Sequence, residues 1–205
     1  MKPEYHRRIT TKALESHVSP VALDAIIAAN LGQDALRYQW GHDYYHYDNN
    51  AFAASDAYVE EQRQVTRQSL AKAIPVLAWQ AFGRLTHTVQ DFYAHSNYVA
   101  LWREQHPGRA SDEIVPLPGD GPTATRLFSG RLYYPLEVLS FVPTLGRLIT
   151  FLLPRDAHAW MNKDDPSRPD FNLAYIAAVK RTVIEFQKLT QSLTVEQADL
   201  FRDKA

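Results

Sequence analysis

The sequence of 205 residues contains no cysteine, which excludes disulfides, thiolate metal sites and a cysteine nucleophile. It also lacks an excess of charge, since 22 Lys and Arg side chains stand against 23 Asp and Glu side chains, for a formal net charge of -1. A chain this close to neutrality offers little attraction to a phosphate backbone. We therefore do not expect nucleic acid as a partner.

The sequence has no apolar run that would cross a membrane as a helix. Residues 136–153 are the most apolar stretch, but Glu137, Pro143, Gly146 and Arg147 interrupt it. This stretch predicts either a buried helix pair or a lid that touches lipid and makes a peripheral membrane contact. The first residues, M-K-P-E-Y-H-R-R, also lack the apolar region of a signal peptide, so a cytoplasmic protein is the default expectation.

Helical periodicity dominates what is present, and no strand-like alternation of useful length occurs. We expect helices over 4–16, 21–30, 55–73, 79–104, 173–189 and 195–202. The aromatic, histidine-rich stretch 33–50 is predicted to be a long loop, and such loops are often functional. The fold class predicted is therefore all-α, with residues 1–205 in a single multi-helix domain.

Three polar side chains define one face of the helix predicted over 79–104. His87, Asp91 and His95 follow one another at intervals of four residues. Each step of four drifts by only about 40° around a helix, so the three side chains project from the same wall. Two imidazoles and a carboxylate form a nitrogen and oxygen ligand set for a metal ion. The alternative is a pair of hydrogen-bonded core histidines beside a surface aspartate.

Further candidate ligands are scattered along the chain. They are His6, Asp34, His42, Asp43, His46, Asp48, His158, Asp164 and Asp165. Helical bundles bring distant segments together in a core, so these residues can meet the central helix. As alternatives, His6 is an exposed residue of a first turn, Asp34 caps a helix, and Asp164 belongs to a turn before Pro166.

One segment resembles a known family. The motif H-T-V-Q-D-F-Y-A-H-S-N-Y, residues 87–98, resembles the signature of the fungal heterokaryon-incompatibility protein C (Het-C) family. The pieces N-L-G-Q-D, H-Y-D-N and H-A-W-M-N-K-D-D-P-S are similar to that family in the same order. More distantly, the H-x-x-x-D helix resembles the zinc-dependent phospholipase C and P1 nuclease group. This resemblance spans roughly residues 5–185 and implies an all-α fold with zinc ions in a cleft.

The resemblance also implies roles for individual residues, with zinc (one to three ions) as the cofactor. It implies one zinc site from His87, Asp91, Asp34 and His46, in which Asp91 bridges two ions and Asp34 is the candidate general base. The residues implied for the remaining ions are His6, His95, His158 and Asp164.

These observations lead to three hypotheses for function. The first is a metal-dependent phosphodiester hydrolase, similar to phospholipase C, that acts on a phosphodiester or phospholipid substrate. The second is a non-catalytic metal-binding helical module that acts through a partner or a membrane, and the third is a single-strand nuclease. The aromatic side chains near the site either border the substrate or pack under the loop. They are Trp40, Tyr44, Tyr45 and Tyr47.

Overall fold

Helices form nearly all the regular structure of the residues that the structure describes. The computed structural model describes residues 1–38, 41–117, 126–140 and 146–203. The α-helices are α1 (Pro3–Leu14), α2 (Pro20–Leu31), α3 (Phe52–Ala71), α4 (Pro75–His95), α5 (Tyr98–Gln105), α6 (Leu136–Ser140), α7 (Gly146–Leu152), α8 (His158–Met161), α9 (Phe171–Gln191) and α10 (Val195–Arg202). Short 3-10 turns occur at Gly32–Asp34, Leu36–Tyr38, Asp43–Tyr45 and Ser111–Glu113. Pairing of extended residues in these ranges is limited to two isolated β bridges, so the all-α prediction is confirmed there.

Several helices begin where the sequence predicts. Ser19 caps α2, because its Oγ accepts a hydrogen bond from the backbone N–H of Ala22 at 3.1 Å. Thr194 caps α10 in the same way and exchanges bonds reciprocally with Gln197, forming a capping box. By contrast, α4 begins at Pro75, four residues before the predicted start at 79, and the proline lies in its first turn, where a missing N–H costs nothing.

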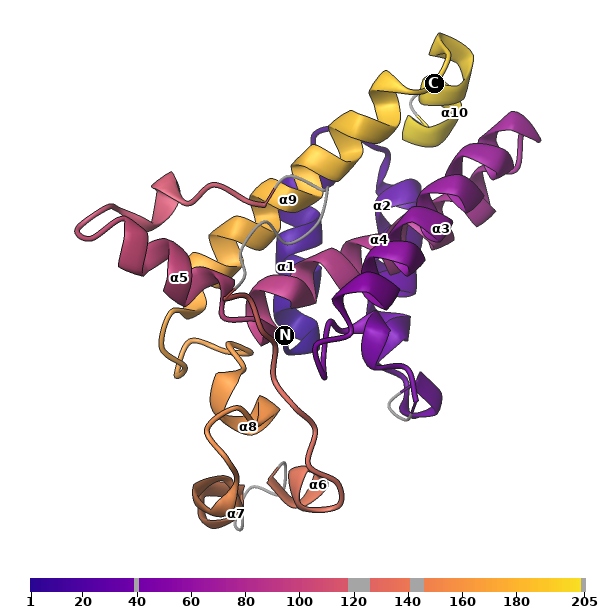
Figure 1. The fold of residues 1–205 in the computed structure, drawn as a ribbon. Coiled ribbons are helices and arrows are strands. Elements are labelled where there is room, and N and C mark those ends of the chain that lie inside the picture. Colours follow the sequence, from indigo (N-terminus) through magenta and orange to yellow (C-terminus); the bar gives the residue numbers. More distant parts are fainter. Residues whose placement is uncertain (39–40, 118–125, 141–145, 204–205) are drawn as a thin grey trace.

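The central helix is α4, which lies among α2, α3 and α9 (Figure 1). Its approach to α2 is very close at Gly83. A Cβ added to Gly83 would lie 2.3 Å from the carbonyl oxygen of Ile26 and 2.8 Å from Cβ of Ala29. The glycine therefore sets the spacing of the two helices, and this spacing brings the loop after α2 to the polar face of α4.

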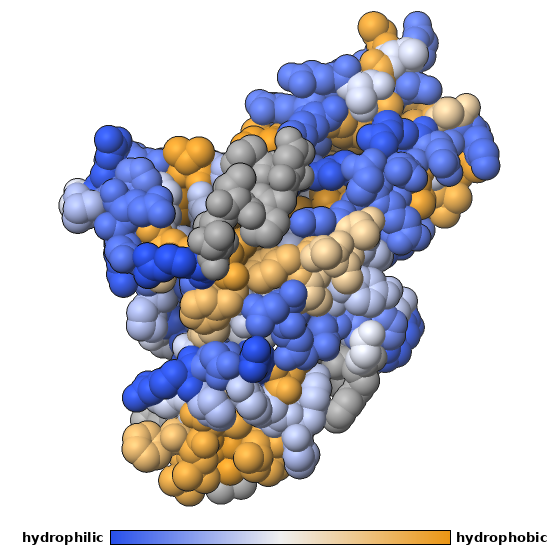
Figure 2. Space-filling model, viewed as in Figure 1, coloured by the Kyte–Doolittle hydropathy of each residue, from blue (hydrophilic) through white to orange (hydrophobic). Residues whose placement is uncertain are grey.

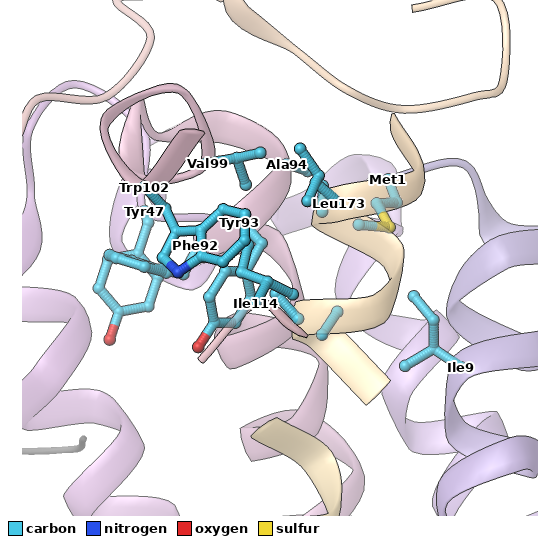
Figure 3. Packing of buried hydrophobic residues seen from close by; sticks show 13 residues of the cluster. Met1, Ile9, Tyr47, Phe92, Tyr93, Ala94, Val99, Trp102, Ile114 and Leu173 are labelled. Carbon is cyan, nitrogen blue, oxygen red and sulfur yellow. The ribbon is translucent and has the colours of Figure 1, made fainter. Parts of the chain in front are cut away.

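Two apolar clusters hold α4 in place. In the first, the rings of Tyr47, Phe92 and Tyr93 gather at the C-terminal half of the helix, as Figure 3 shows. In the second, Phe82 packs edge-on against Phe201, with ring centroids 5.3 Å apart. Because α4 is anchored at both halves, its polar face is held rigidly between them.

The helix predicted over 79–104 is interrupted, because α4 ends at His95. Ser96 has an extended backbone, with φ -94° and ψ 166°, and pairs with Ser129 in an isolated β bridge. The amine of Lys163 donates to two carbonyls at this helix end, at 3.3 and 2.8 Å. Partners distant in sequence thus satisfy the backbone groups that the break releases.

The apolar stretch 136–153 does not form the buried helix pair given above as one alternative. Helices α6 and α7 pack against each other at one end of the molecule, far from α10 (Figure 1). Figure 2 shows apolar side chains gathered on the surface there. The exposed ones are Leu136, Leu139, Leu148, Phe151 and Leu152. Among the described residues, no helix combines the length and apolarity needed to cross a bilayer.

Candidate metal centre

The polar face of α4 is buried. His87, Asp91 and His95 are 0%, 1% and 5% exposed, so Asp91 is a buried carboxylate and not a surface charge. Nε2 of His87 lies 3.0 Å from Oδ2 of Asp91, and Nε2 of His95 lies 3.9 Å from Oδ1. The predicted alignment of the three side chains on one wall is confirmed. A carboxylate buried this deeply requires compensating positive charge or hydrogen bonds.

The loop after α2 brings two more groups to this wall. Nδ1 of His46 lies 2.9 Å from Oδ2 of Asp91 and 3.1 Å from Nε2 of His87. His46 Nδ1, His87 Nε2 and Asp91 Oδ2 therefore form a triangle, which we call the Asp91 triangle. Oδ1 of Asp34 approaches the same His87 nitrogen at 3.6 Å, and the Asp34 side chain is 28% exposed. The half-buried Asp34 connects the triangle with solvent.

The other oxygen of Asp91 faces His6, whose tautomer is fixed by Gln90. The oxygen Oε1 of Gln90 lies 2.7 Å from Nδ1 of His6, while the amide nitrogen of Gln90 donates to Thr10 and Thr182. Since Oε1 only accepts, Nδ1 of His6 donates to it. In the neutral ring Nε2 then carries a lone pair, 3.1 Å from Oδ1 of Asp91 and without a hydrogen-bond donor.

A positively charged group lies beside Asp91 in this structure. The amino group of Met1 lies 2.5 Å from Oδ1 of Asp91 and 3.4 Å from Oδ1 of Asp164. Burial alone would raise the pKa of Asp91, but this amino group and the imidazoles of His95, His87 and His6 outweigh it and hold the pKa well below its usual range. Asp91 therefore stays ionised and favours a cation beside it.

A second group of candidate ligands lies one turn further along α4. One ligand atom from each of Asp48, His95 and His158 lies within 4.8 Å of the others. Nδ1 of His95 is 3.3 Å from Oδ1 of Asp48, and Nε2 of His95 is 3.3 Å from Oδ1 of Asp164. The predicted His95, His158 and Asp164 thus come together. Asp48 was among the candidate ligands of the sequence, two residues after His46 in the same loop, but the resemblance assigned it no role.

Two features position His158. Gly130 passes so close that a Cβ there would lie 2.7 Å from Cα of His158. Glu137 of α6 is buried, accepts a hydrogen bond from the N–H of Ala159 at 2.5 Å, and lies 3.7 Å from Nδ1 of His158. Burial lowers the pKa of His158, so its ring is neutral and available as a ligand.

The four predicted substrate-bordering aromatics separate into different environments. Tyr44 and Tyr45 are half-buried and pack against each other with centroids 4.6 Å apart, and Tyr45 also contacts Tyr58. Tyr47 is 5% exposed, and its hydroxyl donates to Asp56 at 2.6 Å, so it packs in the core. Trp40 lies outside the described residues.

The donor set fits a divalent metal ion such as zinc. Zinc bonds of about 2.0–2.1 Å in a tetrahedron place neighbouring ligand atoms about 3.3 Å apart. The separations within the Asp91 triangle and to Asp34 are 2.9, 3.0, 3.1 and 3.6 Å. Nε2 of His6, which faces Oδ1 of Asp91, also lacks a hydrogen-bond partner, whereas the unpartnered nitrogens of the other two rings, Nε2 of His46 and Nδ1 of His87, are not the atoms of the triangle. Nitrogen and carboxylate donors at these distances match a zinc site better than a saturated hydrogen-bond network.

A cavity of about 250 Å³ lies elsewhere, between α3, α4 and α9. Arg63, Arg67, Glu60 and Glu185 of its lining pair with one another, because Arg63 donates to both Glu185 and Glu60, and Arg67 donates to Glu60. The chemistry is concentrated at the Asp91 triangle and its neighbours.

Comparison with known proteins revises the resemblance proposed from sequence. A family model described as the VWA7 N-terminal domain matches residues 7–110. The match includes Asp34, His46, His87, Asp91 and His95. No curated protein matches the chain, and no solved structure does. The assignment to Het-C, and more distantly to the phospholipase C and P1 nuclease group, is therefore wrong, because the matching family is a different one.

Proposed function

We infer from the site that this chain, which belongs to the VWA7 N-terminal domain family, is a metal-dependent hydrolase of phosphodiesters. The observation that carries this proposal is the Asp91 triangle. Its three atoms lie 2.9, 3.0 and 3.1 Å from one another and are buried. Two of these atoms come from α4, and the third comes from His46 in the loop between α2 and α3.

Hydrogen bonds alone do not account for such a triangle. If the nitrogens of His46 and His87 both donate to Asp91, their own contact brings two N–H groups together. If His87 donates to His46 instead, a nitrogen lone pair of His46 faces the carboxylate at 2.9 Å. Each arrangement of neutral rings places like polarities together. A cation at the centre turns all three contacts into attractions, which supports metal binding.

The two oxygens of Asp91 face different candidate ligands, so Asp91 could hold an ion on each side; on the Oδ1 side the ion would replace the amino group of Met1. Oδ2 belongs to the triangle, whereas Oδ1 faces Nε2 of His6 at 3.1 Å. Asp34 completes the ligands on the triangle side, and the pair of sites would be held by His6, Asp34, His46, His87 and Asp91. Zinc bound there lowers the pKa of a coordinated water toward about 7 and offsets negative charge on phosphate oxygens.

Two further residues would orient groups at this site: Asp34 for the attacking water and Gln90 for the His6 ring. Asp34 is the ligand of this set with the largest exposed fraction, so its carboxylate is placed to orient the attacking water and accept its proton. Gln90 holds the His6 ring in the tautomer that presents Nε2. Phosphodiesters are among the substrates that enzymes with two divalent ions hydrolyse.

The proposal is tested with protein purified without chelator. We expect bound zinc and hydrolysis of bis(p-nitrophenyl) phosphate, both lost after dialysis against EDTA and restored by zinc. Asp91→Asn should lose metal and activity, whereas Asp199→Asn, at an exposed carboxylate, should keep both. Undiminished hydrolysis by Asp91→Asn would refute the proposal. Metal binding without hydrolysis would support the non-catalytic metal-binding module instead.

A further inference from the structure

The exposed apolar end formed by α6 and α7 is not explained by the metal centre. We define the apolar tip as Leu136, Leu139, Leu148, Phe151 and Leu152. Leu148, Phe151 and Leu152 are 63%, 72% and 64% exposed. Figure 2 shows these helices covered by apolar side chains at the end of the molecule opposite α10. Large apolar side chains gathered in this way on a surface mark a contact site.

The charges beside the apolar tip favour an anionic lipid surface as its occupant. Among the described residues 131–140 and 146–156, the acidic residues are Glu137, whose side chain is buried, and Asp156, which pairs with Arg131. Arg131 and Arg155 are exposed at the two ends of this segment. Arg131 lies 3.6 Å from Asp156, and Arg155 lies over the ring of Trp160. Apolar side chains flanked by arginine and tryptophan are typical of segments that rest in the headgroup region of a bilayer.

The helix that carries part of the apolar tip also contacts the second group of candidate ligands. Glu137, within α6, accepts a hydrogen bond from the N–H of Ala159 and lies 3.7 Å from His158. His158 is in turn a member of the group formed with Asp48 and His95. A lipid surface that binds the apolar tip would therefore lie near α8 and its His158.

We propose that the apolar tip docks this protein onto membranes that contain anionic phospholipids, and that the metal centre acts on phospholipids at that surface. The docking depends only on the exposed apolar side chains of the tip and on the charges beside them. The phospholipid substrate rests on the proposed function, because it requires a hydrolytic metal centre.

Docking is tested by sedimentation of the full chain with vesicles of phosphatidylcholine alone or with 30% phosphatidylserine. We expect binding to the mixed vesicles and at least tenfold weaker binding by the triple variant Leu148→Ser, Phe151→Ser, Leu152→Ser. The matched control places serine at three exposed apolar positions near the opposite end: Val76, Leu77 and Val195. It should bind like the unaltered chain.

The outcomes separate docking from hydrolysis. The triple variant should keep its zinc and its activity on bis(p-nitrophenyl) phosphate, but lose release of phosphorylated headgroups from vesicles. Asp91→Asn should still sediment with vesicles. Unaltered vesicle binding by the triple variant, or no binding by the unaltered chain, would overturn the docking. Self-association that the triple variant abolishes would assign the apolar tip to a second copy of this chain instead.

Discussion

Replacement of Gln90 by leucine should destabilise the fold and weaken metal binding together. Gln90 is fully buried in α4 and connects to three other helices. It accepts from His6 at 2.7 Å and Asn30 at 3.2 Å, and it donates to Thr10 and Thr182, each at 3.1 Å. Leucine fills a similar volume but offers none of these bonds. The substitution therefore isolates the polar role of the side chain.

The expected loss of stability follows from the hydrogen bonds that each partner of Gln90 keeps after the substitution. The amide nitrogen of Asn30 keeps its bond to Thr86, and the hydroxyl of Thr182 keeps its bond to Ala178, so neither donor loses its last partner. The His6 ring loses the acceptor of Nδ1, and a buried donor left unpaired costs about 1–3 kcal/mol. With the other lost bonds we expect a total of about 2–4 kcal/mol. For a chain of this size that lowers the melting temperature by about 5–15 °C.

Metal affinity gives the second measurement. Without Gln90, Nδ1 of His6 no longer has an acceptor that fixes the ring, so zinc binding at the His6 side should weaken by about 10–100-fold. Thermal unfolding by circular dichroism and zinc titration by calorimetry measure the two effects. The control is Gln64→Leu on the exposed face of α3, which should change stability by less than about 0.5 kcal/mol. Unchanged melting and unchanged zinc affinity in Gln90→Leu would refute the reasoning.

Two further substitutions test the packing that positions the site. Gly83→Ala should cost about 1–3 kcal/mol, because the new Cβ would lie 2.3 Å from the carbonyl oxygen of Ile26, and a denaturant midpoint near that of the unaltered chain would show that α2 moves away freely. Glu185→Gln should cost about 3–5 kcal/mol, because it removes the buried carboxylate that pairs with Arg63 and Arg181. Urea unfolding measures this loss, and a cost below about 1 kcal/mol would mean that solvent screens the two arginines.

The sequence predicts the central helix and its polar face well, because both are local properties. A four-residue spacing places His87, Asp91 and His95 on one wall whatever surrounds the helix. Asp34 and His46 lie in the long loop rich in such residues, but their selection rested on the resemblance to the zinc-dependent phospholipase C and P1 nuclease group and not on the loop itself. Asp48 shares that loop, but nothing in the local pattern separates it from its neighbours.

Features that depend on distant partners could not be predicted. The break after His95 relies on Ser129 and on the amine of Lys163, which satisfy backbone groups at the end of α4. The exposure of the apolar tip also depends on distant parts of the chain, because it is decided by which elements pack over α6 and α7. Periodicity shows that a segment has an apolar face, but not whether another element covers it.

The measurement that tests the metal centre most directly is elemental analysis of the protein, purified without chelator, beside Asp91→Asn. The buried triangle of two imidazoles and one carboxylate predicts at least one zinc ion per chain, lost in the variant while helical circular dichroism persists. A chain that contains no divalent metal, takes up none on titration with zinc and melts at the same temperature with and without EDTA would contradict it.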